Sequence, residues 1–177
     1  MAIDKIPSVA LDSGVPTRAQ LPAGCILQVV QVVKTDTWTT SSTTMADVTG
    51  LSLTITPTSV NSKVLVLVDV HIGYSVYAGV FYLLRNGVKI YAGDGGLSRC
   101  GLYSNAYTPS NSQYSLIPLT ATFLDSPAST TAVTYKIQGS SYANGTNTYV
   151  NRTAQDINES NRDGLTASSI TLMEVAA

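Results

Sequence analysis

His71 is the only histidine in the chain, so a Ser-His-Asp triad would have to be built on it. Asp69 lies two residues earlier, and side chains two positions apart share one face of a β-strand, a spacing that could orient an imidazole ring. No serine, however, stands in the sequence context of a nucleophile elbow. A histidine on a strand face more often packs and forms hydrogen bonds. We therefore predict that His71 is structural or lies at a subunit interface.

Asp156, Glu159 and Asp163 are three carboxylates within one polar stretch. A glycosidase needs two carboxyl groups roughly 5 to 10 Å apart across a cleft, and nothing in the sequence marks a cleft. The stretch also alternates oxygen-bearing side chains as a calcium loop does, but it lacks the glycine and the final glutamate of the EF-hand template. We therefore predict no enzymatic activity, no metal and no cofactor.

Tyrosine is over-represented among the aromatic residues, with ten tyrosines against two phenylalanines. Tyrosines beside amide side chains suit stacking on a sugar or packing at a protein interface, although half-buried packing on strands is the commoner role of tyrosine. Such a mixture occurs between residues 103 and 114. The candidate receptor-facing residues there are Tyr103, Asn105, Tyr107, Asn111, Gln113 and Tyr114.

Charged residues make up only 12% of the 177-residue chain and the net charge is -1. Soluble proteins average roughly 25% charged residues, so the surface is expected to be rich in hydroxyl groups. The chain lacks the basic field of a nucleic-acid binder and the apolar run of a membrane span. With no secretory signal at its start, the protein is expected to fold in a cytoplasm, where Cys25 and Cys100 stay free thiols.

The segment from Lys63 to Tyr74 has the strongest strand pattern in the chain. Its even positions are all apolar, which is the period of one buried strand face. On the odd positions two leucines precede two polar residues, so the first half of the strand is apolar on both faces. We expect the even face to line a core and the odd face to meet other subunits. The candidate interface residues are Leu65, Leu67, Asp69 and His71.

Several shorter segments alternate in the same way, and no segment has helical periodicity. Asn86-Gly87 between two apolar runs predicts a hairpin, because both residues tolerate positive φ. Pro118 within a predicted strand places that strand at a sheet edge or a bulge. These features predict an all-β fold, a jelly-roll-like antiparallel β-sandwich. The other predicted strands are 25–33, 50–57, 115–124, 133–138, 148–151 and 168–175.

Residues 1–24 contain three prolines and two glycines and only scattered apolar residues, so neither a helix nor a long strand is expected there. We expect an extended N-terminal arm over 1–24 and a head domain over 25–177. The arm is either a disordered leader or a docking segment that orders on a partner. Its candidate anchors are Ile3, Ile6, Val9 and Leu11.

Several segments, in this order and spacing, resemble the distal domains of tail fibres and related virion proteins of tailed bacteriophages, especially phages of aquatic bacteria. The resemblance implies a non-enzymatic virion component, a trimer with a jelly-roll head like those of the tumour necrosis factor superfamily. It begins near residue 21 and runs to the end of the chain. The segments are LPAGCILQVV at 21–30, DVTGLSLTITP at 47–57, SKVLV at 62–66, FLDSP at 123–127 and SITLMEVAA at 169–177.

The chain departs from this family in one respect, because an arm of about 24 residues is too short for a coiled-coil or β-helical shaft. We expect a homotrimeric tail-fibre or short-appendage protein of the virion, made in the host cytoplasm. Its arm would dock on a baseplate, tail or capsid protein, and its distal loops would contact the host surface, with a glycan as the expected receptor. The alternatives are a capsid decoration or head-fibre protein and, least favoured, a carbohydrate-active enzyme. Nucleic acid and membrane insertion are not expected.

Overall fold

The computed structural model describes residues 21–75, 77–93, 112–156 and 163–177. The described residues form β-strands joined by turns, with one short 3-10 helix, η3. Among them, no helix is long and apolar enough to cross a lipid bilayer. The elements are β1 (Ile26–Lys34), β2 (Trp38–Thr40), β3 (Ala46–Ile55), β4 (Lys63–Tyr74), β5 (Val80–Arg85), β6 (Val88–Ile90), η3 (Ser112–Tyr114), β7 (Ile117–Asp125), β8 (Val133–Ser140), β9 (Thr148–Val150) and β10 (Ser168–Val175).

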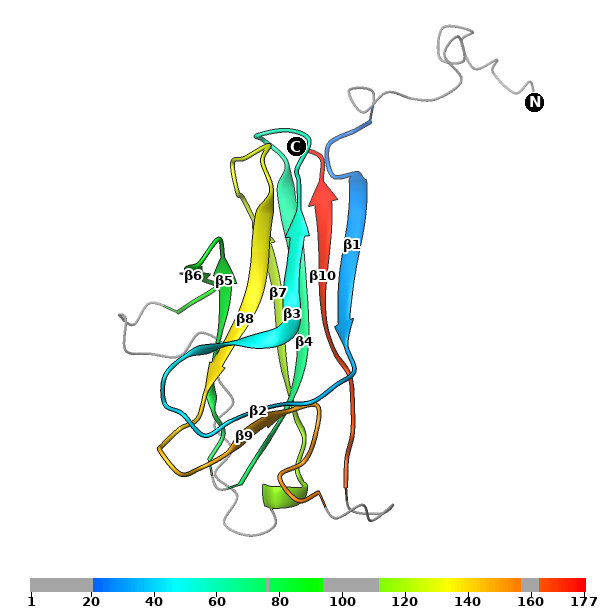
Figure 1. Ribbon diagram of the computed structural model, residues 1–177. Helices are drawn as coiled ribbons and strands as arrows, with labels where there is room; N and C mark the ends of the chain where they lie inside the picture. The colour runs from blue at the N-terminus through cyan, green and yellow to red at the C-terminus, as the bar shows by residue number, and fades with distance from the viewer. Residues whose placement is uncertain (1–20, 76, 94–111, 157–162) are drawn as a thin grey trace, which may run out of the picture.

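The strands form two antiparallel sheets that pack face to face (Figure 1). The first sheet has the order β1-β10-β4-β7, and the short pair β9-β2 continues it beside the end of β4. The second sheet has the order β3-β8-β5-β6. Four antiparallel pairs join strands from the two halves of the chain: β1 with β10, β3 with β8, β4 with β7, and β5 with β6. The chain therefore follows the path of one long hairpin that is wrapped across the two sheets. This pairing is that of a jelly roll, and it confirms the all-β sandwich predicted from the sequence.

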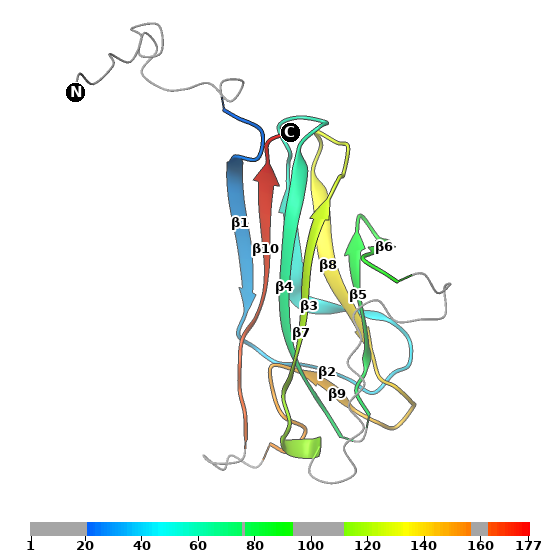
Figure 2. The same ribbon diagram turned by 180° about the vertical axis from the view of Figure 1, so that it is seen from behind.

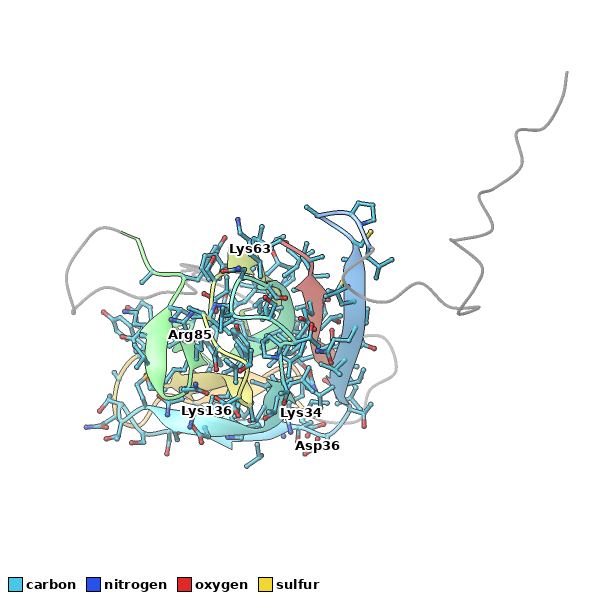
Figure 3. The ribbon with its side chains drawn as sticks, turned by 90° about the horizontal axis from the view of Figure 1, so that it is seen from above. Lys34, Asp36, Lys63, Arg85 and Lys136 are labelled. Atoms are coloured by element: carbon cyan, nitrogen blue, oxygen red, sulfur yellow. The ribbon has the colours of Figure 1, made fainter. Side chains whose placement is uncertain are left out.

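The core lies between the two sheets and is built around β4. All six even-numbered side chains of this strand are at most 3% exposed, as its apolar alternation predicts. They pack against inward-facing side chains of the second sheet, such as Leu51, Phe81 and Tyr135. The outer faces of the sheets lie on opposite sides of the molecule, and seen along the strands they are marked by Lys63 and Lys136 (Figure 3).

The structure agrees with two local predictions from the sequence, the turn at Asn86-Gly87 and the position of Pro118. Asn86 and Gly87 connect β5 to β6 with φ angles of 48° and 82°, both in the left-handed region that this turn requires. Pro118 lies on β7, which pairs with β4 on one side and, among the described strands, forms an edge of the first sheet. An edge strand accommodates proline because the missing N–H faces away from the ladder.

Cys25 is a free thiol, and Cys100 lies outside the described residues.

A buried carboxylate, Asp125 at the end of β7, connects the two sheets. Nη1 of Arg85 on β5 donates to both of its oxygens at 2.7 and 2.8 Å, and the phenol of Tyr135 on β8 donates to Oδ2 at 2.6 Å. Burial raises the pKa of Tyr135, and the hydrogen bond to Asp125 raises it further, so the phenol remains a donor. The contact holds an edge strand of the first sheet against the second.

Asn151 follows β9 and joins four strands. It is fully buried, and its φ of 66° lies in the left-handed region. Its Nδ2 donates to the carbonyl oxygens of Lys34 and Asp36 at 2.8 and 2.9 Å, and Oγ of Ser168 donates to its Oδ1 at 2.5 Å. Its backbone N donates to the carbonyl of His71 at 2.9 Å. The side chain therefore fixes the end of β1 and the start of β10, and the backbone N ties the residue to β4.

Glu174, near the end of β10, is a second buried carboxylate, and it is fully buried. It accepts hydrogen bonds from the backbone N and Oγ1 of Thr58, both at 2.7 Å, and from Nε2 of Gln28 at 2.6 Å. Burial by itself raises the pKa of Glu174, but these hydrogen bonds favour the charged form and outweigh burial. The pKa of Glu174 is therefore below its ordinary value.

Acid is expected to weaken the fold through Glu174. A carboxyl group whose pKa is lower in the folded than in the unfolded chain contributes stability that is complete above the unfolded pKa of about 4.3. That contribution is lost as the pH falls through the folded pKa. The unfolding midpoint, measured from neutral pH downward, should fall in acid. Glu174→Gln should have a lower midpoint at neutral pH, and its midpoint should fall less steeply in acid than that of the wild type. A variant whose midpoint falls as steeply as that of the wild type would contradict this assignment.

Candidate functional site

The outer face of the first sheet carries an apolar row that crosses four strands. Met173 of β10 stands opposite Val29 of β1 on one side and Leu65 of β4 on the other. Leu65 in turn stands opposite Leu124 of β7. Directly opposed residues on one face of a sheet contact each other, so these four side chains form a continuous apolar strip across the face seen in Figure 2.

Further apolar side chains adjoin this row. Leu67 lies two residues along β4, and Val175 of β10 stands opposite Ile26 of β1. The relative exposures of Ile26, Val29 and Leu124 are 48%, 54% and 46%, and the other members are half-buried. Monomeric proteins rarely expose a large contiguous apolar surface. We name these residues the outer patch: Ile26, Val29, Leu65, Leu67, Leu124, Met173 and Val175.

The other half of the same face is mostly polar, although Val33 of β1 is exposed there. Asp69 is exposed on β4, and His71 is half-buried two residues further on. Nδ1 of His71 lies 3.0 Å from the carbonyl oxygen of Ala167, and the backbone N of His71 donates to Oγ of Ser168 at 3.0 Å. The imidazole is therefore oriented by a backbone carbonyl of the neighbouring segment. The four predicted interface residues of β4 do share one face, and the structure adds apolar neighbours from β1, β7 and β10.

The sequence pattern of single strands could not identify those neighbours, because the register between strands is set by the whole fold. Met173 and Leu124 alternate with buried residues in their own strands, which shows only that they face away from the core. The structure shows that they face the same way as Leu65 and lie beside it.

The predicted receptor residues are only partly described. Gln113 and Tyr114 belong to η3, at the end of the sandwich opposite Leu21 and the C-terminus (Figure 1). The carbonyl of Gln113 accepts a hydrogen bond from the backbone N of Gln155 at 2.8 Å. The remaining candidates lie outside the described residues: Tyr103, Asn105, Tyr107, Asn111 and the arm residues Ile3, Ile6, Val9 and Leu11.

The carboxylate stretch is also only partly described, because Glu159 lies outside the described residues. Asp156 forms an ion pair with Arg152, with 2.8 Å between its Oδ2 and Nη1 of the arginine. Within the described ranges, no three His, Cys, Asp or Glu side chains come together as metal ligands would.

Two tyrosines that the sequence reasoning did not single out lie together at the same end as η3. Tyr77 follows β4 and Tyr142 follows β8, and their ring centroids are 4.6 Å apart. Each stands in a short loop between predicted strands that contains one serine and one glycine, and an aromatic residue in such a loop was the signal that the sequence offered. Their proximity depends on the pairing of β8 with β5 and of β9 with β4.

A hollow of about 290 Å³ lies at the other end of the molecule, between the start of β1 and the turn after β3. Its lining combines aliphatic and hydroxyl side chains and includes no ionisable side chain. The lining residues are Leu21, Leu27, Thr58, Ser59, Ser62, Ala176 and Ala177.

The chain matches no protein-family model, and comparison with curated proteins finds no match. The arguments about function that follow therefore rest on the outer patch, the loops and the sequence resemblance described above.

Proposed function

We propose that this protein is a structural component of a bacteriophage virion, the homotrimeric head of a tail fibre or short appendage. The observation that carries the proposal is the outer patch, an apolar strip on the outer face of a sheet whose inner face already fills the core. Burying a leucine or valine side chain fully is worth about 1.5 to 3 kcal/mol, so covering this strip would stabilise an assembly substantially.

A second copy of the chain is the occupant that we propose for the outer patch. Most soluble oligomers are built from identical subunits with closed symmetry, and the net charge of -1 creates little repulsion between copies. The threefold arrangement comes from the resemblance to tail-fibre heads, which implies trimers. The jelly-roll fold agrees with the head that this resemblance implies.

The two ends of the sandwich fit the two tasks of an attachment protein. Gly24 N donates to the carbonyl of Ala176 at 2.8 Å, and Ala176 N donates to that of Cys25 at 2.9 Å. These bonds fix the entry of the chain at one end of the sandwich, where an arm could dock on the virion. The loops at the other end, including η3, would then face the host cell (Figure 1).

Two measurements test the proposal. Light scattering coupled to size-exclusion chromatography should give three times the mass of the chain, and a stable monomer would refute the trimer. An electron-microscopy map of the whole particle should place the head on the tail or baseplate with threefold symmetry. Density on the capsid surface would establish the alternative, a decoration or head-fibre protein, and absence from the particle would refute both.

We also propose that the protein has no enzymatic activity. Incubation with capsular or lipopolysaccharide glycans of the host should release no reducing ends. Release that disappears in the separate variants Asp156→Asn, Glu159→Gln and Asp163→Asn would instead support a carbohydrate-active enzyme.

A further inference from the structure

Tyr77 and Tyr142 form an aromatic pair on the surface at the end of the sandwich away from Leu21. Their rings are tilted by 37° with centroids 4.6 Å apart. Tyr142 is 57% exposed, and Tyr77 is half-buried. A folded protein gains little from leaving a tyrosine ring exposed, whereas tyrosines of this kind are enriched at binding surfaces because they combine an apolar face with a polar tip.

The loop that carries Tyr142 is held in one shape by its own hydrogen bonds. Oγ of Ser141 donates to the carbonyl of Thr146 at 2.6 Å, and Oγ1 of Thr146 donates to the carbonyl of Ala143 at 2.8 Å. Gly145 closes the turn with a φ of 84°. A ring presented from such a loop loses little conformational entropy on binding, which is the benefit of preorganisation.

Two other loops adjoin this one and supply polar groups. The backbone N of Ser141 donates to the carbonyl of Ser42 at 2.7 Å, and Oγ1 of Thr43 lies 3.4 Å from Oδ1 of Asn144. The backbone N of Ser75 donates to the carbonyl of Asn147 at 3.2 Å. These hydrogen bonds join three loops, which bring hydroxyl and amide groups to the end of the sandwich that carries the aromatic pair.

The same three loops carry no formal charge. Residues 41–45, 75–79 and 141–147 contain no Asp, Glu, Lys, Arg or His. Charged groups would be expected in a site for an anionic ligand, because charge-assisted hydrogen bonds are roughly twice as strong as neutral ones. The chemistry of these loops therefore fits a neutral ligand that has both an apolar face and many hydroxyl groups.

We infer that Tyr142, supported by Tyr77, is the stacking platform of a binding site for neutral saccharides. One face of a hexose ring carries C–H groups that lie on an aromatic ring, and its hydroxyl groups can exchange hydrogen bonds with Thr43 and Asn144. The inference deepens the proposed host contact and rests on it. It places the saccharide on the loops after β4 and β8.

The test uses the intact protein and a glycan array that carries neutral hexose and N-acetylhexosamine oligosaccharides beside their sialylated and sulfated counterparts. The wild-type protein should bind neutral glycans, and the anionic forms should bind no more tightly. Affinities for the best neutral glycan are then measured by saturation-transfer NMR and calorimetry. Tyr142→Ala should weaken binding at least tenfold, and Tyr142→Phe, which keeps the ring, should stay within about threefold of the wild type.

Tyr91→Ala is the matched control, because Tyr91 is 42% exposed and also belongs to an aromatic pair, with Phe123. It should bind like the wild type. The inference is overturned if Tyr142→Ala binds as well as the wild type, if only anionic glycans bind, or if the loops bind a host protein and no glycan.

The result can be separated from the test of the proposed function. A trimer located on the virion that binds no neutral glycan would overturn only the saccharide site. Binding that depends on Tyr142 in a monomer absent from the particle would leave the saccharide site in place and overturn the virion role.

Discussion

Replacing Leu65 and Leu67 together with aspartate is expected to convert the proposed trimer into monomers. Both leucines lie in the outer patch and are half-buried within a single subunit, so a neighbouring subunit would cover the rest of each side chain. The variant loses that apolar burial and places carboxylates where they would be desolvated without partners. Together these two effects should weaken the association free energy of each subunit contact by more than roughly 3 kcal/mol. That change raises the dissociation constant more than a hundredfold. Sedimentation over a range of protein concentrations measures it.

A second variant and a control keep this test independent of folding. Val29→Asp with Leu124→Asp changes the most exposed members of the apolar row, which contribute little to the core of one subunit. It should also give folded monomers, as shown by an unchanged circular dichroism spectrum. Val88→Asp changes a residue that is 65% exposed on the second sheet and should remain trimeric. A trimer in both double variants would show that the outer patch is not the subunit contact.

Asn151→Ala is expected to cause the largest loss of stability of any single replacement considered for this protein. It removes two donated hydrogen bonds and one accepted bond in a fully buried place, and it leaves the carbonyls of Lys34 and Asp36 without that donor. Each buried polar group left unsatisfied costs about 1 to 3 kcal/mol. Alanine is also strained at a φ of 66°. We expect a loss of about 4 kcal/mol, seen as a fall in the unfolding midpoint of roughly 8 to 16 °C.

Two further variants separate the causes of this effect. Asn151→Gly loses the same side chain but tolerates the backbone angle, so it should recover about 1 kcal/mol relative to alanine. Asn144→Ala, in an exposed turn, should change stability by less than about 0.5 kcal/mol. All unfolding curves are compared at one protein concentration, because subunit association shifts the midpoint. A loss below about 1 kcal/mol in Asn151→Ala would show that other contacts hold these strands.

Alternation is a local property, so the sequence was sufficient to predict the longer strands and their faces, whereas the three-residue strand β2 was not predicted. The buried even face of β4 and the Asn86-Gly87 turn were predicted from neighbouring residues in the chain, and the edge position of Pro118 is one of the two that were predicted for it. Strand ends differ from the prediction by one or two residues, and β3 begins at Ala46, earlier than the segment chosen from its apolar pattern. A register irregularity between Asp47 and Ser52 breaks the alternation that would have revealed the first part of β3.

The candidate sites could be predicted only in part, because they depend on contacts between distant segments. Glu174 breaks the apolar alternation of β10, yet it points inward because Gln28 and Thr58 supply its hydrogen bonds. The sequence of β10 alone does not indicate those partners. In the same way, Tyr77 and Tyr142 are 65 positions apart in the numbering and meet only because their strands belong to the same sandwich.

The pairing of β1 with β10 also has a consequence for synthesis of the protein. These strands are the first and last of the described elements, and Gln31 and Thr171, which are hydrogen-bonded across them, are 140 positions apart. The sandwich therefore cannot close while the ribosome still holds the last strand. Until then β1 and β4 lack the partner that lies between them, and unpaired strand edges promote aggregation.

Slower expression at low temperature should raise the soluble yield, and a chain that ends before Ser168 should accumulate as aggregate.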